Sequence, residues 1–194
     1  MAGSGCGVPG LMLAATLSSF STSSSISGPS KIFLTDLNPQ TVENVKHNIE
    51  LNQLRDVEAV VIDWSNPSTW PAQSDDIGTS RSGRDKAPHV LCDVVLGSDL
   101  IYQKSLAPLL KSVVLSLLKP GGKFLYVAPD TGRDGMDEFL QDMKLQCPGW
   151  TDRIAPSDYH SNPLPNCDDE ESFLHFQELY QKTYILYEFP SPKK

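Results

Sequence analysis

The stretch LGSDLIYQ, residues 96–103, places an acidic side chain and a phenol at a spacing that suits chemistry. Asp99 and Tyr102 are three residues apart, so both side chains can face one pocket if the segment forms a turn or a helix. The carboxylate could orient an incoming ammonium group and help it lose its proton, while the tyrosine positions the amine. A lysine amine needs such help near neutral pH because its ordinary pKa is about 10.4. The alternative is an aspartate that caps the next helix beside a packed tyrosine.

A glycine-rich loop at the start of the chain forms a second candidate site. Gly3, Gly5 and Gly7 alternate in GSGCG, a pattern typical of enzymes that use S-adenosylmethionine (SAM), and Gly5, Gly7 and Gly10 form a literal G-x-G-x-x-G. Glycine has no Cβ, so the backbone at these positions can come close to a ligand. The longer pattern is the dinucleotide fingerprint, and a glycine-rich terminus without a ligand is the remaining alternative.

Polar residues also end three predicted strands. Asp36 follows KIFLT, and its carboxylate can accept hydrogen bonds from both ribose hydroxyls of an adenosyl group. Asp63 follows VEAVVI and could accept the exocyclic amine of adenine, with the Trp64 indole as an apolar wall. Ser98 ends VLCDVVLGS, where substrate and cofactor should meet. A turn aspartate at position 36 and an ordinary buried tryptophan at position 64 are the alternatives.

Strand and helix patterns alternate along the chain and predict one α/β domain over residues 1–194 with right-handed crossovers. We expect the carboxyl ends of the strands to bind ligands. Loops, which we expect to be flexible, are predicted at 18–30, 66–88 and 156–172, because these stretches are rich in Ser, Pro, Asp and Gly or acidic residues. The predicted strands cover 31–35, 57–62, 90–97, 123–128, 150–154 and 183–189, and the predicted helices cover 11–17, 39–52, 106–118 and 134–145.

Composition excludes several classes of function. The formal net charge of −8 argues against binding to duplex nucleic acid, which relies on clustered Lys and Arg. No apolar run reaches the roughly 18 residues that span a bilayer. Residues 1–30 are uncharged and serine-rich, but they lack the Arg that is typical of a transit peptide. The four cysteines, at positions 6, 92, 147 and 167, lie too far apart for a zinc motif or a disulfide framework, so we expect no metal.

In combination, the segments resemble the seven-β-strand SAM-dependent methyltransferases, and among them the protein-lysine group called methyltransferase family 16. That group carries an acidic residue, two residues of any kind and an aromatic residue directly after the fourth strand, and Asp99-Leu100-Ile101-Tyr102 fits this pattern. The resemblance runs from Gly3 to about Val127, with TYILYEF as the last strand. The segments that carry it are GSGCGVPGL, FLTDLNPQTVENVKHNIELN, VIDW, DVVLGSDLIY and LKPGGKFLYV.

The resemblance implies a Rossmann-like sheet with strand order 3-2-1-4-5-7-6 and SAM as the cofactor. It also implies that Asp99 and Tyr102 face the acceptor. Residues implied to contact SAM are Gly3, Gly5 and Gly7 at its methionine part, Asp36 at the ribose, Asp63 and Trp64 at the adenine, and Ser98 through its backbone. The implied partner is a protein substrate rather than nucleic acid or membrane. We expect a monomer in the cytoplasm, with the nucleus as an additional location.

One departure from the family concerns the first strand. In the family a hydrophobic strand ending in Glu-Leu precedes the glycine loop, whereas Met1 and Ala2 occupy those places here. We therefore expect strand one to be missing or incomplete, as in a truncated chain. The function expected first is SAM-dependent methylation of a protein lysine, with arginine or histidine left open as the acceptor. The alternatives are a truncated isoform that only binds and, more weakly, an NAD-dependent oxidoreductase.

Overall fold

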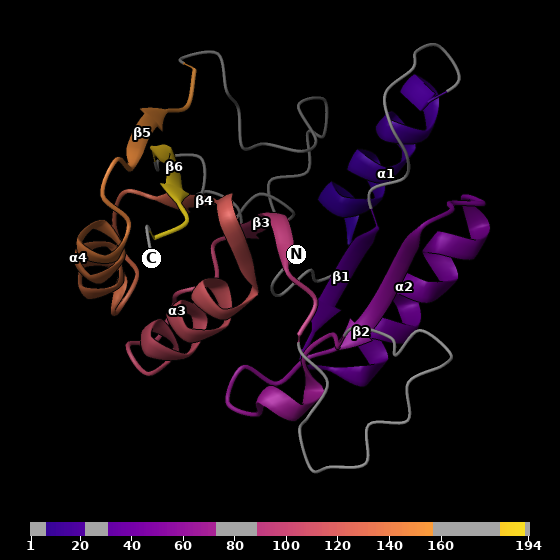
Figure 1. Cartoon of the computed structure of the whole chain (residues 1–194), viewed down its shortest axis with the longest axis horizontal. Coiled ribbons are helices and arrows are strands. Elements are labelled where there is room, and N and C mark those ends of the chain that lie inside the picture. The colour runs from indigo at the N-terminus through magenta and orange to yellow at the C-terminus, as the bar shows by residue number, and fades with distance from the viewer. Residues whose placement is uncertain (1–6, 22–30, 73–88, 157–182, 193–194) are drawn as a thin grey trace, which may run out of the picture.

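The computed structural model describes residues 7–21, 31–72, 89–156 and 183–192 (Figure 1). Within these ranges helices and strands alternate, which confirms the expected α/β class. The elements are α1 (Val8–Ser21), β1 (Ile32–Asp36), α2 (Pro39–Leu51), β2 (Val57–Val61), a 3₁₀ turn (Pro67–Thr69), β3 (Cys92–Ser98), α3 (Leu106–Leu117), β4 (Leu118–Pro129), α4 (Met136–Gln146), β5 (Thr151–Ile154) and β6 (Tyr184–Pro190). None of the helices in these ranges is long and apolar enough to cross a membrane.

Within the described residues the strands form two separate sheets, and no strand one lies between them, in agreement with the expected methyltransferase sheet in which strand one is missing or incomplete. β1 pairs with β2 in parallel, and the larger sheet has the order β3-β4-β6-β5. In the larger sheet β3 and β4 are parallel, whereas β6 runs antiparallel to both of its neighbours. In the expected order, β1 and β2 correspond to strands 2 and 3, and the order β3-β4-β6-β5 corresponds to strands 4-5-7-6. Among the described residues no strand pairs with both β1 and β3, so a continuous seven-stranded sheet is not confirmed.

The small sheet and α2 form as the sequence predicts. Asn38 caps α2 by accepting a hydrogen bond from the Gln40 amide at 2.9 Å, and Pro39 occupies the first helical position. Val42 and Val45 lie on the helix face that packs against Leu34 of β1, so this half of the protein has a small core of its own.

The larger core surrounds β4, whose Phe124 and Tyr126 side chains are fully buried. Phe124 stacks on Tyr126, with ring centroids 5.5 Å apart, and on Phe189 of β6 at 6.1 Å, while Phe139 of α4 meets it edge-on. α3 and α4 cover this part of the sheet with apolar side chains. A third cluster ties the two halves together, and its members are Ile62, Trp70, Val113 and Leu117, with Val60 and Trp64 beside them.

Two predicted boundaries were wrong. Residues 18–21, the first part of the loop predicted for 18–30, belong to α1 instead. Serine costs well under 1 kcal/mol relative to alanine in a helix, so a run of serines does not by itself end one. The remainder of that loop, most of the 66–88 loop and residues 157–172 lie outside the described residues.

β4 begins at Leu118, five residues before the predicted strand, so KPGG does not separate α3 from the strand. Gly122 allows the first part of β4 to lie close to β3. A Cβ at this position would be only 2.9 Å from the Asp93 carbonyl oxygen, so a residue with a side chain would not fit. The pairing of β3 with β4 is correspondingly irregular between Cys92 and Val94.

We expect the Phe124→Ala substitution to lower the free energy of unfolding by about 3–5 kcal/mol, because it empties the centre of the aromatic cluster. Leu145→Ala on the exposed side of α4 is the matched control and should change that free energy by less than about 0.5 kcal/mol. Urea unfolding followed by circular dichroism measures both. Equal effects of the two substitutions would contradict the position of the core.

Candidate active site

The turn that follows β3 carries Asp99 in a conformation that few side chains adopt. Asp99 has a φ of +48°, in the left-handed region, where aspartate is tolerated better than most residues. Its amide donates a hydrogen bond to the Val127 carbonyl oxygen of β4 at 2.8 Å. The chain therefore leaves the sheet sharply at Asp99 while remaining attached to β4.

Tyr126 of β4 holds the next two residues of this turn. Its hydroxyl oxygen accepts hydrogen bonds from the amides of Leu100 at 3.1 Å and Ile101 at 3.2 Å. Burial raises the pKa of Tyr126 to about 12, so the phenol is neutral at physiological pH. Leu100 and Ile101 enter the core, whereas Asp99 is half-buried and the Tyr102 side chain is 61% exposed. The two predicted acceptor-facing residues thus flank a buried pair.

Arg133, which the sequence analysis missed, binds the Asp99 carboxylate. Its Nε donates to Oδ1 at 2.6 Å and its Nη2 donates to Oδ2 at 2.5 Å, which is the paired geometry that arginine forms with carboxylates. The hydrogen bond to Asp99 raises the pKa of Arg133 further above its ordinary value. The sequence signal that could have revealed it is an arginine in the segment TGRDG, at the carboxyl end of the strand next to β3.

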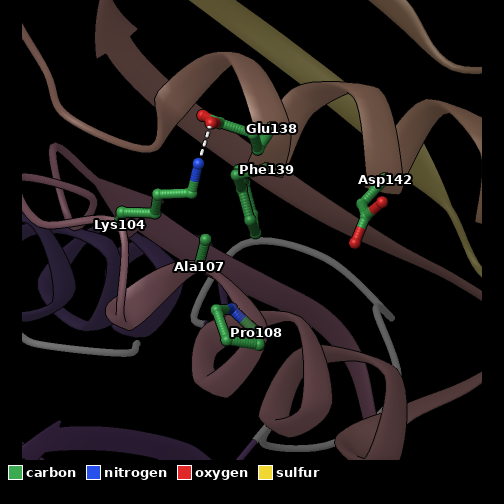
Figure 2. A pocket seen from close by; sticks show the side chains of 6 residues that line it. All are labelled: Lys104, Ala107, Pro108, Glu138, Phe139 and Asp142. Carbon is green, nitrogen blue, oxygen red and sulfur yellow. Dashed lines mark hydrogen bonds and ion pairs between the residues drawn. The ribbon is translucent and has the colours of Figure 1, made fainter.

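The loop that contains Arg133 is fixed to the loop after β3 at further points. Asp134 accepts a hydrogen bond from the Lys104 amide at 3.0 Å, and Lys104 Nζ forms an ion pair with Glu138 of α4 (Figure 2). Gly135 has a φ of +84°, and a Cβ there would lie 2.4 Å from the Lys104 Cα atom. Only glycine allows this approach, so residues 99–105 and 130–135 are held together as one unit.

A small pocket lies between the start of α3 and α4, next to this pair of loops (Figure 2). It has a volume of about 270 Å³ and an apolar floor. None of its lining residues is a predicted site residue. The lining consists of Lys104, Ala107, Pro108, Glu138, Phe139 and Asp142.

Asp36 and Asp63 come to one edge of the small sheet. Asp36 ends β1, and its carbonyl oxygen accepts a hydrogen bond from the Ile62 amide at 2.9 Å, which places Asp63 one residue beyond this contact. The Asp36 carboxylate accepts the Asn38 amide through Oδ1 at 3.0 Å. Both carboxylates therefore lie at the carboxyl ends of adjacent parallel strands, as predicted.

The Asp63 carboxylate is set up to remain charged. The Ser65 hydroxyl and amide both donate to its Oδ1, at 2.6 and 2.8 Å, and these bonds hold the pKa of Asp63 below its ordinary value. Its carbonyl oxygen accepts the indole N–H of Trp70 at 2.9 Å. The Trp64 side chain is half-buried and packs against two of the core clusters.

Gly7 is the part of the glycine loop that the structure describes. It has a φ of +80°, and a Cβ there would lie 3.2 Å from a methyl group of Val45 and 3.5 Å from Leu34. The Gly7 carbonyl oxygen accepts the Leu11 amide at 2.9 Å, so the loop leads directly into α1. Gly3 and Gly5 lie outside the described residues, Gly10 lies inside α1, and Ser98 is exposed at the end of β3.

These residues fit an adenosyl cofactor by the hydrogen-bond acceptors that they present. Asp36 and Asp63 offer carboxylate oxygens at one sheet edge, and Gly7 sits tightly at the entrance to a helix. The structure joins Asp99 to Arg133, whereas the two carboxylates of the small sheet have their own local partners. In the described ranges, no group of three or more His, Cys, Asp and Glu side chains could hold a metal ion.

Comparison with known proteins identifies the family. A family model described as lysine methyltransferase matches residues 2–146, from the glycine loop to the end of α4. The chain belongs to the lysine methyltransferase family. No curated protein sequence matches it closely enough to count as a relative. The family and the fold imply SAM as the cofactor.

Solved structures support the fold of this methyltransferase. A predicted O-methyltransferase from Agrobacterium tumefaciens is 12% identical, with a TM-score of 0.59 over 100% of this chain and 74% of the other. A putative rRNA methylase from Clostridium thermocellum is 13% identical, with a TM-score of 0.54 over 100% and 87% of the two chains. The [4+2]-cyclase SpnF is 14% identical, with a TM-score of 0.61 over 100% and 74%. This chain covers 42% of the length of another similar structure, TrmN from Thermus thermophilus. At these identities the likeness shows the fold alone.

We expect the Tyr126→Phe substitution to lower the free energy of unfolding by about 1–3 kcal/mol, because it leaves the buried amides of Leu100 and Ile101 without an acceptor. Tyr187→Phe, at a second buried tyrosine of the same sheet, is the matched control and should have the smaller effect. Denaturant unfolding at pH 7 measures both.

The raised pKa of Tyr126 also predicts that the stability of the wild type, compared with Tyr126→Phe, depends on alkaline pH. The pKa of Tyr126 is about 12 in the folded protein and about 10 in the unfolded chain, so the unfolded state loses this proton first. Stability from this group is therefore complete below pH 10 and is lost between pH 10 and 12, by on the order of 2–3 kcal/mol. The difference in unfolding free energy between the wild type and Tyr126→Phe should shrink over that range. A constant difference would contradict the assignment.

Proposed function

We propose that this chain transfers a methyl group from SAM to a lysine side chain of a protein substrate. The position of Asp99 carries the proposal. Its carboxylate is half-buried and fixed at the carboxyl end of β3, and the exposed Tyr102 follows after two buried residues. The family match, which includes this turn, supports lysine as the acceptor.

The cofactor supplies an electrophilic methyl group on a positively charged sulfur. Direct displacement then requires a neutral amine nitrogen in line with that methyl at roughly 3–3.5 Å. As the carbon–nitrogen bond forms, the carbon–sulfur bond would break and the demethylated cofactor would leave. In the proposed site Gly7, Asp36 and Asp63 bind the cofactor, and Ser98 lines the boundary between cofactor and acceptor. Gly3 and Gly5 stay predictions for the methionine part, as does Trp64 for the adenine. No covalent intermediate with the protein is needed.

Asp99 orients the acceptor amine. An ionised carboxylate has about four lone-pair positions, and Arg133 uses one on each oxygen. The other positions can accept hydrogen bonds from a lysine ammonium. With its charge balanced by Arg133, the Asp99 carboxylate orients the amine rather than acting as a strong base. Tyr102, exposed beside it, is placed to contact the lysine stem.

The charge of the chain supports a basic protein partner. A formal net charge of −8 favours association with a basic protein surface and disfavours a nucleic-acid substrate. We propose that the chain acts as a monomer on a protein in the cytoplasm, with the nucleus as an additional compartment, and without membrane association.

Two substitutions should separate the cofactor site from the acceptor site. Asp36→Ala removes the proposed ribose acceptor and should weaken SAM binding at least tenfold, because a ligand hydrogen bond to a charged group contributes about 1.5–3 kcal/mol. Asp99→Ala should abolish methyl transfer. It should leave the SAM affinity within about twofold of the wild-type value, a change in binding free energy far smaller than the 1.4 kcal/mol of a tenfold change. Isothermal titration with SAM measures affinity. Loss of SAM binding in Asp99→Ala would assign that residue to the cofactor site or the fold.

A cell extract incubated with this chain and SAM labelled on its methyl group should yield labelled protein, with N-methyllysine after hydrolysis. Label on small molecules alone would refute the protein-lysine proposal, and label on arginine or histidine would change the acceptor. Titration with NAD is the control for the dinucleotide fingerprint. Heat with NAD but not SAM would favour the oxidoreductase, and heat with neither would favour a chain that only binds.

A further inference from the structure

We propose that Arg133 is a positioning residue, which holds the Asp99 carboxylate in the orientation needed to receive the acceptor amine. This inference rests on the proposed function. It adds a residue outside the Asp99-Leu100-Ile101-Tyr102 motif, 34 positions along the chain from Asp99, in the loop between β4 and α4.

The geometry of the pair restrains the carboxylate in two ways. Two parallel hydrogen bonds, at 2.6 and 2.5 Å, fix both the direction and the plane of the carboxylate group. Both side chains are largely shielded from water, with 21% of the Arg133 side chain and 29% of the Asp99 side chain exposed. A single hydrogen bond to one oxygen would leave the group free to rotate, so the second bond supplies the orientation.

Arg133 is itself anchored, which supports positioning rather than a removable guard. Its Nη1 donates to the Gly132 carbonyl oxygen at 3.3 Å, and the neighbouring Asp134 binds the Lys104 amide. Gly135 lies against the Lys104 backbone without space for a Cβ. The backbone that carries Arg133 is therefore fixed to the Asp99 turn at several points, which keeps the guanidinium close to the carboxylate.

The charge of Arg133 also favours the reactive form of the acceptor. An unpaired Asp99 carboxylate would stabilise an ammonium ion beside it and raise the pKa of the acceptor lysine, which hinders loss of the proton. Arg133 balances the negative charge of Asp99. The carboxylate can then still orient the lysine amine by hydrogen bonds, while it raises the pKa of that amine less. In the part of the chain that the structure describes, the other titratable groups that interact with Arg133 are the phenols of Tyr126 on β4 and Tyr184 on β6. The Asp134 carboxylate accepts the Lys104 backbone amide, and the Lys104 ammonium pairs with Glu138.

A double-mutant cycle tests the inference with Arg133→Gln, Asp99→Asn and the combined variant, and Arg133→Lys serves as the conservative form. Arg55→Gln, on the exposed turn before β2, is the matched control for loss of one arginine charge. The measurements are the rate of methyl transfer to the labelled extract protein between pH 6 and 10, SAM affinity by calorimetry, and thermal unfolding.

We expect Arg133→Gln to reduce the turnover rate roughly 10- to 100-fold, as misplacement of a group that orients the reactants does. SAM affinity should be unchanged, and the rise of the rate with pH should move to higher pH. Arg133→Lys should be intermediate, because lysine restores the charge but not the paired hydrogen bonds. In the Asp99→Asn background the same change should have little further effect, because Arg133 acts through Asp99.

Three results would overturn the inference: wild-type turnover in Arg133→Gln, a faster rate in that variant, or an equal loss in the Asp99→Asn background. If the wild type methylates no extract protein, the proposed function fails separately. Thermal unfolding of the four proteins of the cycle then decides the role of Arg133. Non-additive effects of the two substitutions support the pairing, and additive effects refute it.

Discussion

The hydrogen bonds that the Tyr126 hydroxyl accepts from the turn after β3 link the core of the protein to its candidate active site. The phenol ring is part of the aromatic cluster on β4, while its oxygen binds the amides of Leu100 and Ile101. The next residue of β4, Val127, binds the Asp99 amide, and the loop after β4 supplies Arg133. Every described contact that fixes Asp99 therefore comes from one strand and the loop that follows it. A change in the packing of β4 would therefore move the Asp99 carboxylate even if no residue in contact with the carboxylate were altered.

The two halves of the site belong to different sheets. Asp36 and Asp63 lie at the edge of the β1–β2 pair, whereas Asp99 and Arg133 lie at the end of the larger sheet. Methyl transfer requires a fixed distance between cofactor and acceptor, so the packing between these halves has a catalytic consequence. In the described residues the cluster of Ile62, Trp70, Val113 and Leu117 provides that packing. Trp70 also donates a hydrogen bond to the Asp63 carbonyl oxygen, which couples the cluster to the proposed cofactor side.

The sequence predicted local features of this arrangement well and long-range ones poorly. Apolar runs located the strands, Asn38-Pro39 located the start of α2, and strand ends located Asp36, Asp63 and Asp99, because each depends on neighbouring residues. Arg133 was missed because the contact depends on β3 and β4 being neighbours and on the path of the loop after β4. The early start of β4 likewise depends on pairing between distant segments.

The left-handed conformation of Asp99 shows what this site requires of the chain. Such a φ is uncommon for a residue with a side chain, although aspartate adopts it more readily than most, and contacts around Asp99 hold it there. Here the enforcing contacts are the Val127 carbonyl, the Tyr126 hydroxyl and the Arg133 guanidinium. A glycine would relieve the backbone but remove the carboxylate, and a relaxed aspartate would disturb the entry of Leu100 and Ile101 into the core. The left-handed turn allows two core residues and an oriented carboxylate to follow one strand directly, and the proposed acceptor site at the end of β3 depends on that combination.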